Sequence, residues 1–192
     1  MKTDTDTRKK IIDAMYHLIS EYGYDKASLS KLCDAVGITK PSVYYYFPSK
    51  EAILLAVFDD IHIPTDDDTA LLATTTPAEF RAQLLKLGQD SIARFHDDIE
   101  RHRVMAEIDL QTTRIPALAE HRTSIGEKTS NSYEHLLQHG IDIGALPADF
   151  NVGAAAQFLY TLMSGMSQTV PNNESIDERA VWNWLVEKLL LP

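Results

Sequence analysis

Apolar residues recur at a spacing of three and four positions along most of the chain, which is the spacing of one face of an α-helix. In the first such stretch this face holds Ile11, Met15, Leu18, Ile19 and Tyr22. Gly23 follows, and glycine ends a helix at low cost because it adopts the left-handed conformation easily. No stretch alternates apolar and polar residues as a strand would. The pattern predicts an all-α protein of about nine helices.

The segment that follows is predicted to hold three helices in close succession. Ser28 is placed as the N-cap of the first and Thr39 as the N-cap of the second, because a hydroxyl oxygen can accept a free backbone N–H. Gly37 lies in the turn between them, Pro48 ends the second helix, and a third is predicted over residues 49–63. Two short helices joined by a turn that contains glycine are typical of a helix-turn-helix.

The acidic, threonine-rich segment 64–76 is the candidate boundary between two domains. We expect a helix-turn-helix domain over 1–55, with helix 49–63 as its connector, and a second helical domain over 64–192. Further helices are predicted from a capping box at Thr76, around Arg103–Leu110, over Pro116–Gly140, from Asp149 to about Val170, and from a second capping box at Ser175.

Net charge is unevenly divided along the chain. The whole chain carries −10, but residues 1–50 hold eight Lys and Arg against six Asp and Glu. The remaining residues hold ten against twenty-two and therefore carry −12. The N-terminal part can thus approach phosphate while an acidic body stays turned away from it.

The composition also indicates a compartment. The single cysteine, Cys33, excludes an internal disulfide and a multi-cysteine zinc site, and it fits a reducing cytosol. No uninterrupted apolar run approaches the roughly 20 residues that span a bilayer, and the charged N-terminus lacks the apolar core of a secretory signal. We expect a cytoplasmic protein with no membrane partner and, in the absence of a glycine-rich phosphate loop, no cofactor.

The outward side of the second short helix carries the most informative chemistry. The apolar spacing leaves Lys40, Ser42, Tyr44, Tyr45 and Tyr46 pointing largely outward. In a helix-turn-helix this helix enters the major groove of double-stranded DNA, where tyrosine rings can contact sugars or thymine methyls and the hydroxyls can donate to phosphate. The alternative is that the tyrosines belong to a helical core and the lysine is an ordinary solvated charge.

The same residues resemble a known family. Gly37-Ile38-Thr39, followed by the run from Ser42 to Glu51, is similar to the DNA-binding motif of tetracycline-repressor (TetR) type regulators. The resemblance implies phosphate or groove contacts by Ser28, Thr39, Tyr44, Tyr45 and Lys50, and base contacts by Lys40 and Ser42. Tyr46 stands where the family usually has histidine. The family further implies a dimeric repressor on a palindromic operator, released by a small-molecule effector.

In such regulators the last two long helices usually pair across a twofold axis. The residues that we expect at a homodimer interface are the apolar ones of those helices: Val152, Ala155, Leu159, Leu162, Met166, Trp182, Leu185 and Leu189. The alternative is that these faces pack inside one monomer. The residues that could line an effector pocket are Phe95, Met105, Tyr133, Phe158 and Met163, each of which could equally be plain core.

Seven histidines raise the alternative of an enzyme. His135 and His139 lie four residues apart, a spacing that can hold zinc, and His96-Asp97 resembles the paired ligands of helical metal-dependent phosphohydrolases. Neither pair has a further ligand at a matching position, so we expect no metal site and no enzyme. A helical adaptor without a DNA role is a third class, but it leaves the three adjacent tyrosines unexplained.

Overall fold

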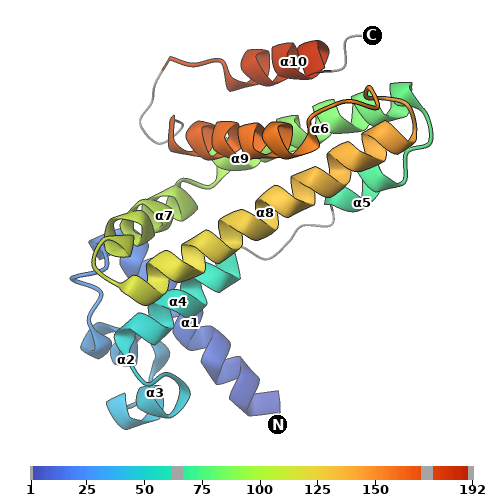
Figure 1. Cartoon of the computed structure of the whole chain (residues 1–192). Helices are drawn as coiled ribbons and strands as arrows, with labels where there is room; N and C mark the ends of the chain where they lie inside the picture. Colours follow the sequence, from blue (N-terminus) through green and yellow to red (C-terminus); the bar gives the residue numbers. More distant parts are fainter. Residues whose placement is uncertain (1, 62–66, 170–174, 190–192) are drawn as a thin grey trace. The chain divides into compact units, whose positions relative to one another are not determined.

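The computed structural model describes residues 2–61, 67–169 and 175–189. These residues form ten helices and no strand, which confirms the predicted all-α class (Figure 1). No helix in this part of the chain is long and apolar enough to cross a membrane. The described residues fall into two compact units, unit 1 from 1–63 and 100–123, and unit 2 from 64–99 and 124–192.

Unit 1 contains the predicted helix-turn-helix. Its first four helices are α1 (Lys2–Tyr22), α2 (Leu29–Val36), α3 (Lys40–Tyr46) and α4 (Lys50–Ile61). Most of α7 (Ile99–Thr112) and the first turns of α8 (Pro116–Asp142) belong to the same unit. Residues 62–63 of the predicted connector lie outside the described residues.

The core of unit 1 follows the helical spacing read from the sequence. Ile11, Met15 and Ile19 of α1 are buried, and α1 packs against α2 and α4. Leu32 of α2 and Val43 of α3 close the core beneath the turn. Burial of these side chains, each contributing roughly 1.5–3 kcal/mol, holds the short helices in place because seven or eight residues are too few for a stable isolated helix.

Unit 2 contains α5 (Asp67–Leu72), α6 (Pro77–Asp97), the rest of α8, α9 (Val152–Thr169) and α10 (Glu178–Leu189). The predicted capping box is present at the start of α6, where Thr76 and Glu79 satisfy each other's backbone N–H. The core gathers Phe80, Leu84 and Ile92 of α6 with Leu136 and Leu137 of α8 and residues of the last two helices.

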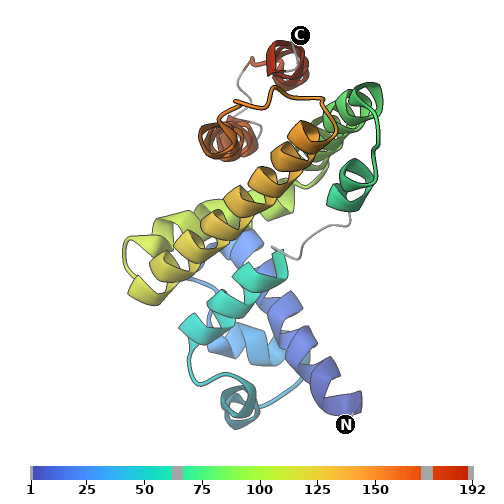
Figure 2. The ribbon, with the colours of Figure 1, turned by 45° about the vertical axis from the view of Figure 1, so that its right-hand side comes forward.

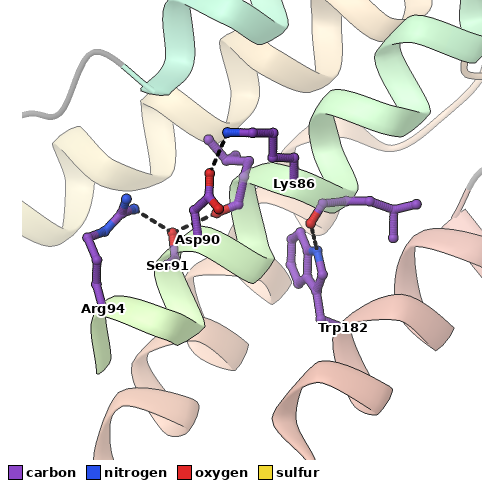
Figure 3. Close-up of polar contacts among 7 residues, drawn as sticks. Lys86, Asp90, Ser91, Arg94 and Trp182 are labelled. Carbon is purple, nitrogen blue, oxygen red and sulfur yellow. Dashed lines mark hydrogen bonds and ion pairs between the residues drawn. The ribbon is translucent and has the colours of Figure 1, made fainter. Parts of the chain in front are cut away.

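Helix α10 makes a close approach to α6 at Trp182, which is drawn in Figure 3. The indole of Trp182 is buried, and its Nε1–H donates to the Leu85 carbonyl at 3.1 Å. The ring lies so close to Gly88 that a Cβ there would stand 2.0 Å from the indole. Only glycine at this position lets the two helices approach.

One helix was not predicted, and the start of another needs correction. Residues 67–72 of the boundary segment 64–76 form α5. The last helix begins at Glu178, and its cap is Asp177, whose side chain accepts the Ala180 N–H at 2.9 Å, instead of the predicted box at Ser175. Val170, the expected end of α9, lies outside the described residues.

Candidate nucleic-acid interface

Helices α2 and α3 are joined by a turn that only glycine adopts easily. Ser28 caps α2 by accepting the Lys31 N–H, and α2 ends at Gly37 with a φ of +74°. The N–H groups of Gly37 and Ile38 both donate to the Cys33 carbonyl, at 2.9 and 3.1 Å. This pairing of two N–H groups with the last turn closes α2 and reverses the chain toward α3.

Helix α3 starts with a double hydroxyl contact. The Thr39 hydroxyl accepts the Ser42 N–H at 3.3 Å and lies 2.9 Å from the Ser42 hydroxyl. One of the two hydroxyl hydrogens is used between them, which leaves the other available to a ligand. Thr39 therefore caps the helix and still presents hydrogen-bonding capacity at its N-terminal end, where the helix dipole favours an anion.

The outward side of α3 is polar and aromatic, as the sequence predicts. Lys40 is exposed, and Tyr44 and Tyr45 keep 50% and 76% of their surface in solvent. Tyr46 is half-buried and meets Tyr45 edge to face, with ring centroids 5.0 Å apart. Inward, Val43 and Phe47 are buried, so the helix is anchored by one face and offers the other. Exposed tyrosine rings of this kind are suited to a surface that a partner covers.

Lys50 lies in a more enclosed place than the sequence indicates. Its ammonium donates to the Tyr24 carbonyl and stands 4.1 Å from the centroid of the Tyr24 ring. Burial lowers the pKa of Lys50 below its ordinary value, against the opposing effect of Asp25. Three N–H donors belong to an ammonium, so two remain for a further ligand. Sequence reasoning missed Tyr24, because its role depends on a contact across 26 residues.

Helix α7 also contacts the turn between α1 and α2. The Tyr24 N–H donates to the Glu107 carboxylate at 2.9 Å, and the same carboxylate lies 3.2 Å from where a Cβ on Gly23 would stand. Gly23 has a φ of +76°, a left-handed conformation that favours glycine. Glu100 contacts His17 at 2.6 Å and Arg114 contacts Asp25 at 3.5 Å. Glu100 and Glu107 of α7, and Arg114 just after its C-terminal end, are spaced seven residues apart along the chain.

The residues predicted for a dimer interface lie mostly inside unit 2. Leu159, Met166, Trp182 and Leu185 are buried in the core of one chain, where Val152, Ala155 and Leu162 pack against them. The side chain of Leu189 lies outside the described residues. Packing within the monomer already accounts for this apolar pattern, as the sequence alternative stated.

The residues predicted for an effector pocket are not all together. Met163 is buried in the unit 2 core, and Phe95 and Tyr133 pack against it. Phe158 keeps 51% of its surface exposed on the opposite side of α9, and Met105 belongs to unit 1.

The histidines that raised the enzyme alternative have separate partners. His96 lies 3.5 Å from the Glu178 carboxylate, and His139 lies 3.0 Å from the Thr74 carbonyl. His135 is exposed on α8. Within the described ranges, no three His, Cys, Asp or Glu side chains are arranged to hold a metal ion.

Comparison with known proteins places the helix-turn-helix in a family. Residues 11–57 match the model for bacterial regulatory proteins of the tetR family. The chain is 24% identical over 196 residues to the fatty acid metabolism regulator protein of Bacillus subtilis, covering 99% of this chain and 97% of that one. It is 25% identical to the HTH-type transcriptional regulator UidR of Escherichia coli, over 86% and 83% of the two chains. A putative TetR-family regulator from Mesorhizobium loti has the same fold, with a TM-score of 0.79, 20% identity and coverage of 97% and 96%.

Proposed function

Because this chain belongs to the TetR family of bacterial regulatory proteins, we propose that it is a homodimeric repressor that a small-molecule effector releases from a palindromic operator. The observation that carries the proposal is the outward side of α3, where Lys40, Tyr44 and Tyr45 stand exposed on a helix anchored by Val43 and Phe47. A recognition helix needs this combination of a fixed inner face and a free outer one. In this proposal the repressor acts in the cytoplasm, where bacterial DNA is accessible to it.

The proposed DNA contacts are of two kinds, those that read base edges and those that position the protein on the phosphate backbone. Lys40 and Ser42, in the first turn of α3, are suited to base edges, because a recognition helix reads bases with its N-terminal residues. Tyr44, Tyr45 and Thr39 are suited to phosphate and sugar, with Ser28 at the start of α2 and the half-buried Tyr46 at the edge of the contact. Lys50 reaches phosphate with the donors that Tyr24 leaves free.

The dimer interface uses the outer sides of α9 and α10 in this proposal, opposite the buried residues first expected there. Phe158 is exposed, as is the side of α9 formed with Ala154, Thr161 and Gly165 at helical spacing. On α10, Val181 and Trp184 keep 39% and 58% of their surfaces in solvent. Figures 1 and 2 both draw the two helices side by side. Large exposed apolar side chains on neighbouring helices favour coverage by a second copy.

Release by an effector requires that a change in the 64–192 domain reach the recognition helix. The supporting contacts are those of Glu100, Glu107 and Arg114, which hold α1 and the α1–α2 turn. Helix α7 follows α6 directly, and Phe95 of α6 and Tyr133 and Met163 of the unit 2 core are the candidate effector neighbours. We propose a hydrophobic or amphipathic effector, in line with the apolar residues available and with a relative named for fatty acid metabolism.

Selection of bound DNA from a pool of random duplexes tests this function. The expected result is an enriched palindrome whose half-sites are centred one helical turn apart, roughly 34–36 Å, because a twofold dimer reads the same sequence twice. Recovery of duplexes with no common sequence, by a protein that is folded and helical, would overturn it.

A further inference from the structure

Arg8 lies against the end of the recognition helix. Its guanidinium carbon stands 4.9 Å from the centroid of the Phe47 ring, and Phe47 is the buried C-cap of α3. Arg8 belongs to α1 and is exposed. The N-terminal end of α1 and α3 lie at the same end of unit 1 in both views (Figures 1 and 2). The residue precedes the segment 11–57 that matches the family model.

The two cations next to Arg8 are already paired with carboxylates. The Lys9 ammonium lies 2.6 Å from Asp13 and 2.9 Å from Asp60, which raise the pKa of Lys9. Lys10 lies 2.7 Å from Asp6. Among the described residues, no carboxylate is paired with Arg8. Of this run of three cations, Arg8 alone keeps its charge uncompensated in unit 1.

The chemistry of arginine suits both contacts at once. A guanidinium stacks on an aromatic ring with its flat face and donates hydrogen bonds from its edge, so the Phe47 ring can hold it without using its donors. Bound phosphate would accept from that edge, and such charge-assisted bonds are among the strongest available to a protein.

The position of Arg8 also favours phosphate over base edges. The seven residues of α3 rise about 10 Å along the helix axis, slightly less than the roughly 12 Å width of the major groove. If the first turn reads bases, the C-cap end of α3 lies toward a wall of the groove, where the phosphates are. We propose that Arg8 is a further DNA-contacting residue that binds a backbone phosphate of the operator, oriented by Phe47. This rests on the proposed DNA-binding function.

Salt dependence of binding separates a phosphate contact from a structural role. The probes are two labelled duplexes, the one enriched by selection and a scrambled version, and the full-length variants are Arg8→Gln, Arg8→Lys and Lys10→Gln. Lys10→Gln is the matched control. It also removes one positive charge from α1, but the Lys10 ammonium is already paired with Asp6. Thermal unfolding of each variant checks that the fold is kept.

Arg8→Gln should weaken binding about tenfold on both duplexes and lower the slope of log affinity against log salt by about one, while Lys10→Gln changes the slope much less. Arg8→Lys should keep the slope, since the charge remains. An Arg8→Gln slope equal to that of Lys10→Gln overturns the proposal and leaves the repressor function intact. So does equal weakening by Arg8→Gln and Arg8→Lys without a change of slope, which would indicate support of Phe47 only. Wild-type protein that binds both duplexes equally would instead contradict the repressor function itself.

Discussion

At the residue scale, Tyr24 connects three parts of unit 1. Its N–H donates to Glu107 of α7, its carbonyl accepts from Lys50 at the start of α4, and its ring lies under the same ammonium. Burial raises the pKa of the Tyr24 hydroxyl to about 12, and the nearby carboxylates of Glu51 and Asp25 add to the effect. Tyr24, in the α1–α2 turn, therefore helps to set the position of Lys50.

This raised pKa predicts a late-titrating tyrosine. Because the folded protein disfavours the phenolate, Tyr24 contributes stability below its ordinary pKa of 10 that is lost as the pH rises toward about 12. Ultraviolet titration should show a tyrosine component that ionises late, and Tyr24→Phe should reduce the size of that component. Tyr44→Phe is the control, because it removes one hydroxyl from an exposed ring outside the Tyr24 contacts. A late component of unchanged size after Tyr24→Phe would contradict this assignment.

Local chemistry decided which single residues could be predicted. The caps at Ser28 and Thr39 were readable because a cap bonds to a residue three positions away. The partner of Lys50 was not, since it is 26 residues distant, and Glu107 is 83 residues from the amide it accepts. No periodicity in the sequence reports such pairs.

At the element scale, the attachment of α10 to α6 depends on the absence of one side chain. Gly88→Ala would place a methyl group 2.0 Å from the buried Trp182 ring, so the helices or the indole must shift. We expect a loss of roughly 1–3 kcal/mol in the free energy of unfolding, measured by denaturant titration at fixed protein concentration. Gly153→Ala is the control, because its nearest neighbour is a Glu134 oxygen at 3.8 Å. Equal stability of the two variants would show that this close approach is not required.

Whole helices were predictable where apolar spacing was long and capped. The capping box at Thr76 and the apolar positions that follow it predicted α6 almost completely. Helix α5 was missed because six residues in an acidic, threonine-rich segment give less than two turns of pattern. The start of α10 was placed too early because Ser175 and Asp177 are both suitable caps, and only the contact of Asp177 with the Ala180 N–H distinguishes them.

At the scale of the whole molecule, the proposed dimer predicts opposite effects of substituting two neighbouring residues of α9. Phe158 is half exposed, whereas Leu159 is buried with 3% of its surface in solvent. Light scattering should give twice the chain mass of 21.6 kDa for the wild type and the chain mass for a folded Phe158→Glu variant. Leu159→Glu should instead lose its fold, because a charge buried without a partner costs several kcal/mol. A wild type at 21.6 kDa, or a dimeric Phe158→Glu variant, would count against this interface.

The two faces of α9 explain why the sequence alone does not choose between the two candidate dimer interfaces. Ala156, Leu159, Met163 and Met166 form the buried face, but Phe158 and the small residues beside it give the outer face an apolar character too. Hydrophobic periodicity identifies a helix with two such faces without indicating which one a second chain would cover. The exposed fraction of each side chain in the folded unit is what favours the outer face in the proposed dimer.

Whether α3 reads a DNA sequence is tested by the ratio of affinities for the selected operator and its scrambled version. Fluorescence anisotropy at one fixed salt concentration should give a ratio of roughly a thousandfold or more for the wild type. Lys40→Ala should reduce this ratio about tenfold, because a lost base contact weakens only the correct sequence. Lys128→Ala, which removes an exposed charge from α8, should leave it unchanged. A wild-type ratio near one, or a ratio that Lys40→Ala does not alter, would contradict the account.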